Sequence, residues 1–505
     1  MALACGESAE DPSPARDAGQ HADAATDAQA DGNASDAGDD GAPSDARLDA
    51  AADAVIEGAS DASIPLDPSN FYTRVPSTAG GAEGIAIRVE HPGTLGARYA
   101  DGAPTVVVVP GGHTAGDLNP PDAPQDGVVR AGLIRIELLF PGGSSGNWAS
   151  GGTYDYRGPS CQQAVADVVD YAAGQRPDAD GLRLQDRVPF AMTSIVGAIG
   201  QSNGGNVLLQ TIQNHANVRH ELSWIVTWES PLGPQYVNVE LGRLGKPLNP
   251  FYVPGTAQLL GCPWPGMETE LLFDPNVPKT IVDPHTHATR NVNGIFCLDQ
   301  DHNGLCGPAE YSFPGMGGPG PSASEPRLYH SLQLTHLIAN HQATVFGSSA
   351  WPPWLADAAA TYSYWQERDG ALAIEKLPTL APDLPWILGA TVEDHVQGQP
   401  DHPHVRVPLN EMVDGSLSFV RCNPDASYLA ALTGLSTAQL PENAANTHLP
   451  WPGTESHLLP EEVAGVQLNS YISTAAQLEL SDRVYTGELA PDLAAPLVPV
   501  DAQFP

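Results

Sequence analysis

Residues 194–205 read Ser-Ile-Val-Gly-Ala-Ile-Gly-Gln-Ser-Asn-Gly-Gly and contain the pentapeptide Gly200-Gln201-Ser202-Asn203-Gly204. An apolar, strand-like run precedes this G-x-S-x-G motif, and helix-compatible residues 206–212 follow it. The spacing predicts a sharp strand-to-helix turn with a serine at its tip, because glycines on either side let strand and helix approach closely. Ser202 is therefore a candidate nucleophile. The alternative interpretation is an ordinary glycine-rich turn.

The apolar runs on either side of the motif predict more strands of the same sheet. They are residues 85–89, 105–109, 133–140, 224–228 and 417–421, with a predicted amphipathic helix at 162–173. The run 105–109 is continuous and β-branched, which is typical of a strand buried on both faces. Strands that alternate with helices indicate a parallel sheet with crossover helices, which binds ligands at the carboxyl ends of its strands. The predicted class is α/β.

Three segments resemble the α/β-hydrolase superfamily. They are Pro110-Gly111-Gly112 after a buried strand, the motif around Ser202, and residues 384–394, which are similar to the late strand that delivers the acidic residue. The resemblance covers about residues 70–230 and resumes near 325. It implies a mostly parallel, doubly wound sheet with a cap insertion. It also implies a serine hydrolase that cleaves ester or amide bonds through an acyl-serine intermediate, with a carboxylic ester favoured over a peptide bond.

Composition divides the 505 residues into four parts. Residues 1–67 are rich in Asp and Ala and poor in branched and aromatic residues, which predicts a disordered acidic tether. Residues 68–229 are expected to form the first half of the hydrolase core and 326–505 the second half. Residues 230–325 are rich in Pro and Gly and are expected to form a cap over the site.

A serine nucleophile requires a histidine base, and the histidine requires a carboxylate that fixes its tautomer. The superfamily's order along the chain is serine, acid, histidine. We predict Asp394 as the acid because it follows the strand-like run 384–392. Glu229 is the alternative acid, since it directly follows the strand after the motif. A solvated turn aspartate is the competing interpretation of Asp394.

The histidine is harder to assign. It usually lies in the loop after the last strand, but Cys422-Asn423-Pro424-Asp425 follows residues 417–421. We predict His404, which lies close behind Asp394 at the start of a following helix. His395, His448 and His457 are the alternatives, and an exposed or structural role competes for each of them.

Two backbone N–H groups are expected to stabilise the oxyanion of the tetrahedral intermediate. One belongs to Asn203, the residue after the nucleophile. The other belongs to Gly112, in the loop Gly111-Gly112-His113. A simple Pro-Gly turn is the competing interpretation of that loop.

The insertion contains a complete calcium-loop pattern, D-x-[DN]-x-[DN]-G-x5-E, from Asp299 to Glu310. It resembles an EF-hand-type loop, although Pro308 and the surrounding glycines argue against helices on both sides. The ligand set comprises Asp299, Asp301, Asn303, Leu305 and Glu310. We predict structural Ca²⁺ there; an Asp-rich turn without metal is the alternative.

Cysteine and histidine residues near this loop lead to two further inferences. Cys297 and Cys306 bracket the loop and are the expected disulfide. The pair His285 and His287 lacks a clear third ligand, so zinc is disfavoured there.

The residues Met1-Ala2-Leu3-Ala4-Cys5-Gly6 resemble the end of a bacterial lipoprotein signal. We therefore expect an extracytoplasmic protein, either a cell-envelope lipoprotein or a secreted one. Membrane attachment is expected only through a lipid on Cys5, because no other apolar stretch approaches about 20 residues. An incidental thiol in the tether is the alternative.

The formal net charge of -38 excludes nucleic-acid binding, since no basic stripe is present to meet phosphates. The expected partner is a small-molecule, lipid or peptide ester-type substrate. A catalytically inactive, calcium-binding surface protein on a hydrolase scaffold is the alternative function, because a fold alone does not imply activity.

Overall fold

The computed structural model describes residues 69–500 with internal gaps at 94–95, 113, 119–126, 233–240, 242–248, 257–263, 265, 283–288, 314–315, 318–327, 347–350, 353, 397–400, 442–447 and 452–457. The predicted tether, including Cys5, lies outside the described residues, as does Cys262.

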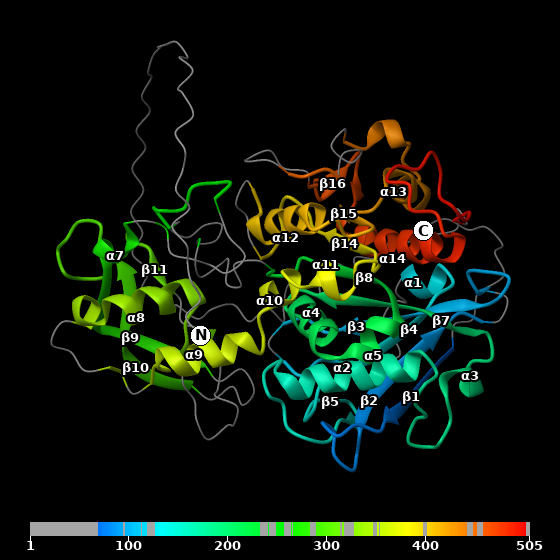
Figure 1. The fold of residues 1–505 in the computed structure, drawn as a ribbon, viewed down its shortest axis with the longest axis horizontal. Helices are drawn as coiled ribbons and strands as arrows, with labels where there is room; N and C mark the ends of the chain where they lie inside the picture. Colours follow the sequence, from blue (N-terminus) through cyan, green and yellow to red (C-terminus); the bar gives the residue numbers. More distant parts are fainter. Residues whose placement is uncertain are drawn as a thin grey trace, which may run out of the picture. The chain divides into compact units, whose positions relative to one another are not determined.

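A twisted central sheet organises the described residues (Figure 1). Its spatial order is β1 (Ser69–Val75), β2 (Ile85–His91), β4 (Ile134–Leu138), β3 (Ala103–Val109), β7 (Ala191–Gln201), β8 (Leu222–Trp228), β14 (Trp386–Gly389) and β15 (Val420–Cys422). β2 pairs antiparallel with both β1 and β4, and the strands from β4 to β15 run parallel. This order and direction are those of the α/β-hydrolase fold, so the predicted fold class is confirmed.

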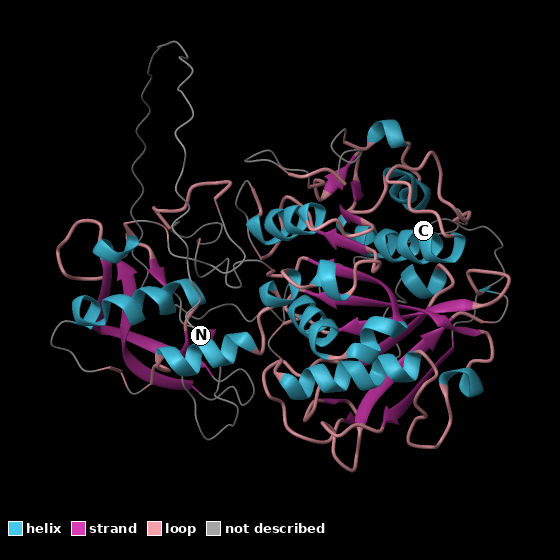
Figure 2. Cartoon of the chain, in the orientation of Figure 1, coloured by secondary structure: helices cyan, strands magenta, loops and turns pink. Residues whose placement is uncertain are grey.

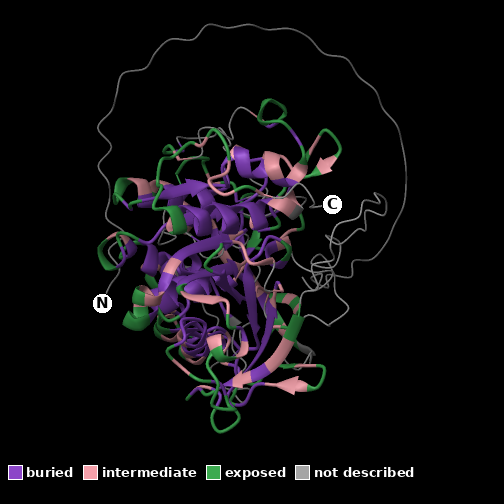
Figure 3. Ribbon diagram, turned by 90° about the vertical axis from the view of Figure 1, so that its right-hand side faces the viewer, coloured by how far each residue is buried: buried purple, intermediate pink, exposed green. Residues whose placement is uncertain are grey.

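Strand burial follows the sequence pattern. All seven residues of β3 are buried, as its unbroken β-branched run predicts. The predicted strands at 85–89, 105–109, 133–140, 194–199 and 224–228 correspond to β2, β3, β4, β7 and β8. Figure 3 shows the buried sheet lying between its covering helices.

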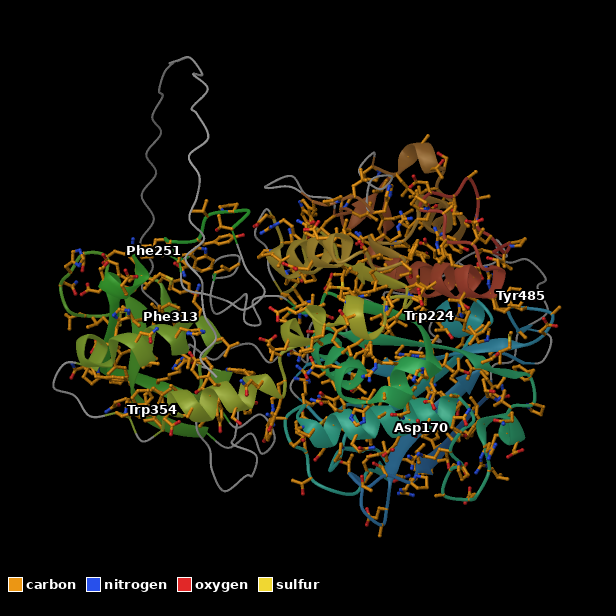
Figure 4. The ribbon with its side chains drawn as sticks, viewed as in Figure 1. Asp170, Trp224, Phe251, Phe313, Trp354 and Tyr485 are labelled. Carbon is orange, nitrogen blue, oxygen red and sulfur yellow. A yellow bond between two sulfur atoms is a disulfide. The ribbon has the colours of Figure 1, made fainter. Side chains whose placement is uncertain are left out.

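Helices cover both faces of the sheet (Figure 2). One apolar cluster joins the sheet to α2 (Pro159–Ala172), α4 (Gly204–Asn214), α5 (Ala216–Glu221), α10 (Ala371–Ile374) and α12 (Pro403–Asp414). A second cluster joins it to α1 (Gly127–Arg130), α13 (Ala426–Thr433) and α14 (Asn469–Thr486). Trp224 of β8, labelled in Figure 4, is fully buried in the second cluster. The sheet is therefore doubly wound.

Smaller elements lie in the connections. They are α3 (Leu184–Arg187), α11 (Leu377–Leu380), the 3₁₀ turn η3 (Thr437–Gln439), and the short pairs β5 (Ser144–Ser145) with β6 (Trp148–Ala149) and β16 (Glu462–Val463) with β17 (Val466–Gln467).

The insertion between β8 and β14 has its own sheet and its own apolar core. Its strands are β9 (Leu271–Val282), β10 (Thr289–Leu298) and β11 (Ser312–Phe313), paired antiparallel in the order β11-β10-β9. Further elements are α7 (Met267–Glu270), the pair β12 (Met316–Gly317) and β13 (Leu328–Tyr329), α8 (Leu332–Phe346) and α9 (Ala358–Gln366). Phe313 and Trp354, labelled in Figure 4, belong to its core.

This insertion differs from the prediction in two ways. It extends past residue 325, because Leu334, Leu337 and Ile338 of α8 pack with Phe273 and Phe296 of the small sheet. It also contains enough apolar sequence to form a core, although its Pro and Gly content indicated irregular structure.

The cysteines agree with the prediction where the structure describes them. Cys297 and Cys306 form a disulfide, as predicted. Cys161 and Cys422 are buried free thiols. No helix in the described part of the chain is both long and apolar enough to cross a bilayer.

Close packing of α4 on β3 explains one glycine of the motif and gives a stability prediction. A Cβ on Gly204 would lie 2.3 Å from the carbonyl oxygen of Val109. Gly204→Ala should therefore lower stability by about 1–3 kcal/mol through overpacking, measured by urea denaturation. Gly307→Ala is the matched control, because its Cβ would meet nothing closer than 3.6 Å. Equal stability losses in the two variants would contradict this packing argument.

Candidate active site

Ser202 lies at the turn between β7 and α4, as the motif predicts. Its backbone φ is +45°, a left-handed conformation that is uncommon for a residue with a side chain. The Ser202 N–H donates to the carbonyl of Trp228, 2.7 Å away, which ties the turn to the end of β8. The side chain of Ser202 is thereby presented at the carboxyl edge of the sheet.

Two side chains from the neighbouring strands complete a hydrogen-bonded chain with Ser202. His395 follows β14, and its Nε2 lies 3.1 Å from Ser202 Oγ. Its Nδ1 lies 2.6 Å from Oε2 of Glu229, the residue directly after β8. Thr391 Oγ1 donates to the other oxygen of Glu229 at 3.3 Å.

This geometry fixes the role of each ring nitrogen. Glu229 is a carboxylate acceptor, so the Nδ1 of His395 carries the proton that it shares with Glu229. Nε2 then presents its lone pair to Ser202 Oγ and can accept the hydroxyl proton. A serine, a base and an orienting carboxylate in this arrangement can perform acyl transfer.

The predicted acid and base are corrected by these contacts. Asp394 and His404 bond to each other instead, with His404 Nε2 2.7 Å from Asp394 Oδ2 and both side chains fully buried. Among the described hydrogen bonds, the ring that reaches Ser202 is that of His395. His404 lies in the first turn of α12, and its fully buried ring bonds to Asp394 rather than to Ser202.

The other two histidines considered as the base, His448 and His457, are not seen in contact with Ser202 in the described part of the chain. His448 Nδ1 lies 3.5 Å from Asp492 Oδ1 near the C-terminal end of the chain. His457 lies outside the described residues.

Glu229 comes one strand earlier than the predicted Asp394, whereas His395 comes from the same connection between β14 and β15 as the predicted His404. Glu229 follows β8, the strand next to β7, and His395 follows β14, the next strand again. The sequence contained a signal for this shift, because Cys422 to Asp425 occupy the loop after β15 and contain no histidine. A base that is absent from the loop after β15 is expected in the connection before β15, and the acid is then expected after an earlier strand.

The predicted oxyanion donors lie beside the turn. A Cβ on Gly111 would be 3.2 Å from the Cβ of Ser202, so this loop lies directly against Ser202. The carbonyl of Gly112 accepts a hydrogen bond from Asn203 Nδ2 at 3.3 Å, and Gly112 has φ +64°. Arg157 Nη2 donates to the carbonyl of Gly111 at 2.8 Å and holds the loop from the other side.

The carboxylates near His395 have perturbed pKa values of opposite sign. Burial raises the pKa of Glu229 above its usual value, although the hydrogen bond from His395 partly offsets this effect. Burial also acts to raise the pKa of Asp394, but the adjacent His404 outweighs it and the pKa of Asp394 is lowered overall. Asp394 therefore carries the more firmly held negative charge of the two.

The predicted calcium loop follows β10 and precedes β11, so strands flank it where an EF-hand would have helices. Carboxylate oxygens of Asp299, Asp301 and Glu310 lie within 4.8 Å of one another. Asp299 and Glu310 are buried and Asp301 is exposed. The turn contains His302 at φ +56° and Gly304 at φ +77°.

The donor chemistry of this loop suits a hard cation. Its carboxylates are oxygen ligands, which Ca²⁺ prefers. Asp299 also accepts the backbone N–H groups of Asn303 and Gly304, and Glu310 accepts those of Gln300 and Gly307. These bonds orient the two buried carboxylates before any ion binds. His285 and His287, where the sequence disfavours zinc, lie outside the described residues.

No protein-family model and no curated protein matches the chain. Part of the chain is similar to solved structures of esterase Est22 (12% identity, TM-score 0.26, covering 33% of this chain and 45% of that one) and of a bacterial heroin esterase (16% identity, TM-score 0.26, covering 35% and 50%). A prolyl endopeptidase structure is similar at 13% identity and TM-score 0.24, covering 35% of this chain and 23% of that one. These matches span at most half of the neighbouring chains.

The raised pKa of Glu229 leads to a prediction about pH and stability. A group whose pKa is raised on folding contributes stability below its unfolded pKa, about 4.3 for Glu, and loses that contribution as pH rises through the folded value. Glu229→Gln removes this ionisation, so the melting temperature of the variant should rise relative to wild type between pH 4 and pH 8. Calorimetry across this range measures the difference.

Asp178 provides a control of opposite sign. Burial acts to raise the pKa of Asp178, but the hydrogen bond from Arg187 helps to lower it overall. Asp178→Asn should therefore be less stable than wild type by a nearly constant amount from pH 4 to pH 8, and this deficit should shrink only as pH falls below about 3.9. The prediction fails if both variants follow the same trend.

Proposed function

We propose that this protein is a serine hydrolase that cleaves carboxylic ester bonds, or amide bonds, through an acyl-Ser202 intermediate. The observation that carries the proposal is the continuous contact from Ser202 Oγ through His395 to Glu229, at 3.1 Å and 2.6 Å. The position of these three residues also supports the proposal. They lie at the carboxyl edge of an α/β-hydrolase sheet, where ligands bind in such folds.

In the acylation step, Ser202 Oγ attacks the substrate carbonyl carbon while its proton passes to Nε2 of His395. The resulting imidazolium is stabilised by the Glu229 carboxylate through the Nδ1 proton. Collapse of the tetrahedral intermediate breaks the bond to the leaving group, which takes the proton from Nε2. The products are the free alcohol or amine and the acyl ester of Ser202.

In the deacylation step, water attacks the acyl carbonyl carbon and gives its proton to Nε2 of His395. The second tetrahedral intermediate expels Ser202 Oγ, which recovers the proton from Nε2. The carboxylic acid leaves, and the enzyme returns to its starting protonation state. We place esters before amides because an alcohol departs more readily than an amine.

The backbone N–H groups of Asn203 and Gly112 are the proposed donors to the oxyanion. Asn203 is the N-cap residue of α4, where N–H groups have no partner within the helix and the helix dipole favours negative charge. Removing one such donor typically costs about a hundredfold or more in rate.

The proposed setting is extracytoplasmic, with a small-molecule, lipid or peptide ester as substrate. The Cys297–Cys306 disulfide supports an oxidising compartment. A lipid on Cys5 remains the proposed means of membrane attachment. The net charge of -38 is unfavourable for a nucleic-acid partner.

The competing function is a catalytically inactive protein on a hydrolase scaffold. This alternative is less favoured once a histidine partner for Ser202 is present. It depended on the absence of an obvious histidine for Ser202, whereas His395 occupies hydrogen-bonding distance. A fluorophosphonate probe separates the two functions, because it bonds covalently only to an activated serine.

Ser202→Ala should abolish hydrolysis of p-nitrophenyl acetate and fluorophosphonate labelling while leaving the melting temperature nearly unchanged, since only a partly exposed hydroxyl is lost. His395→Ala should be about as damaging, and Glu229→Gln should reduce kcat by about 10³ to 10⁴ through loss of the correct tautomer. His448→Ala is the matched histidine control and should retain wild-type rates. Turnover that persists in Ser202→Ala would exclude the acyl-serine mechanism.

We also propose that structural Ca²⁺ binds the loop from Asp299 to Glu310. Asp299, Asp301, Asn303 and Glu310 would supply side-chain oxygens, and Leu305 would supply its backbone carbonyl. The ion would stiffen the turn that the Cys297–Cys306 disulfide already closes. The buried, oriented carboxylates of Asp299 and Glu310 support this proposal.

Calcium should raise stability without taking part in the chemistry. A ligand that binds only the folded state adds RT ln(1 + [L]/Kd), about 2.7 kcal/mol at a hundred times Kd. Chelation should lower the melting temperature, and Asp301→Ala should lower it similarly and abolish the response to chelator. Asp383→Ala, which changes another exposed aspartate, is the control. Loss of Ser202 labelling on chelation, with the fold intact, would place the ion in the active site instead.

A further inference from the structure

A second histidine–carboxylate pair lies directly behind the first. Asp394 Oδ2 is bonded to His404 Nε2 at 2.7 Å, and the other oxygen, Oδ1, accepts the backbone N–H of Val396 at 2.6 Å. Oδ1 also lies 3.9 Å from Nδ1 of His395. The Nδ1 side of the proposed base therefore faces two carboxylates, Glu229 in hydrogen-bond contact and Asp394 just beyond it.

The start of α12 fixes this pair in place. His402, the N-cap residue of α12, has φ +37°, and its Nε2 lies 3.1 Å from the carbonyl of Val392. Two residues later, His404 reaches Asp394. The loop 391–396 is thus held at both Val392 and Asp394 by two side chains, His402 and His404, from one end of α12.

The opposite side of the loop is also held by hydrogen bonds. The N–H of Val392 donates to the carbonyl of Leu459 at 3.0 Å, and the N–H of Asp394 donates to the carbonyl of Thr391 at 3.2 Å. His395 is the partly exposed side chain that projects from this anchored loop toward Ser202. A change in the orientation of Asp394 therefore moves the backbone next to His395.

The negative charge of Asp394 also affects the protonation of His395. A carboxylate within about 4–6 Å of a histidine favours the protonated ring and raises its basicity. The pKa directions described above make Asp394 the more firmly ionised member of the two carboxylates. Asp394 can thus stabilise the imidazolium of His395 without touching Ser202 or the substrate.

We infer that Asp394, oriented by His404, is a positioning residue that holds the His395 loop in register and raises the basicity of His395. This inference rests on the proposed serine hydrolase function. It assigns to the Asp394–His404 pair a role in the same reaction that is distinct from those of the acid and the base.

Other ionisable groups act on the same corner of the molecule. Glu229 contacts His395 from the end of β8. Glu461, which precedes β16, shares a hydrogen bond with Glu393 of the His395 loop. Burial, together with the charges of Glu393 and Glu229, raises the pKa of Glu461. These groups remain unchanged in every variant below, so a difference in pH profile between wild type and an Asp394 variant reports on Asp394.

The test compares Asp394→Asn with wild type for p-nitrophenyl acetate hydrolysis, followed by titration of the released acid from pH 5 to pH 9. We expect kcat to fall by about tenfold or more with little change in KM. The acidic limb of kcat/KM should move to lower pH by about one unit, because a negative charge near His395 is lost. A merely structural residue would not move this limb.

Asp178→Asn is the matched control. Asp178 is also a buried carboxylate with a lowered pKa and a charged partner, Arg187, but it lies in the loop before α3. This variant should lose stability while its acidic limb stays at the wild-type position. A limb that moves equally in both variants would overturn the inference.

Two variants of His404 test the orienting contact and cover the case in which Asp394→Asn does not fold. His404→Gln keeps an N–H donor near Asp394 Oδ2 and should retain kcat within about threefold of wild type. His404→Ala removes the donor and should lose kcat by about tenfold or more. These magnitudes follow the tenfold cost of about 1.4 kcal/mol in a transition-state interaction. Equal kcat values in the two His404 variants would contradict the role of this contact.

The failure of this inference is distinguishable from failure of the proposed function. If Ser202→Ala remains active, the acyl-serine mechanism is wrong and the Asp394 inference fails with it. If Ser202→Ala is inactive but Asp394→Asn leaves both kcat and the acidic limb unchanged, only the positioning role is wrong.

Discussion

The site depends on the left-handed backbone of Ser202, at φ +45°, in a turn too tight for side chains at its flanking glycines. Gly200 and Gly204 let β7, β3 and α4 meet at backbone contact distance, and this packing is what maintains the strain at Ser202. β7, β8 and β14 are neighbours in the sheet, so their carboxyl ends bring Ser202, Glu229 and His395 together. The same constraint extends to Glu229, whose φ is +41°.

Burial of charge is the second constraint. Glu229 and Asp394 lie on the same side of His395, and two buried carboxylates so close disfavour each other's ionisation. Each carboxylate has its own hydrogen-bond partners. Asp394 bonds to His404, while Glu229 bonds to His395 and Thr391. A nearby unpaired negative charge would otherwise compete with Glu229 for the Nδ1 proton of His395.

Sequence patterns predicted the parts of the fold that depend on local chemistry. The β-branched run of β3 and the glycines around Ser202 have few structural alternatives, so both the fold class and the position of Ser202 at a strand-to-helix turn followed from them. The disulfide followed from the short spacing of Cys297 and Cys306. The hairpin of β9 and β10 could not be predicted in this way. Its strands contain Asp, Asn and Pro, and they are stabilised by long-range packing onto α8.

The acid and the base were harder to predict for a related reason. Asp394 and His404 are ten residues apart and do form a pair, but they bond to each other and not to Ser202. Glu229 and His395 lie 27 and 193 residues from Ser202 in the chain. Strand order brings them to Ser202, and a single sequence does not reveal that order.

The most direct test of the central claim is a proton NMR spectrum of the far-downfield region, recorded before and after fluorophosphonate addition. The proton between His395 Nδ1 and Glu229 should give a resonance that moves when Ser202 is modified. It should be absent in Glu229→Gln and present in His404→Gln. A resonance that responds to modification of Ser202, survives in Glu229→Gln and disappears in His404→Gln would contradict the account.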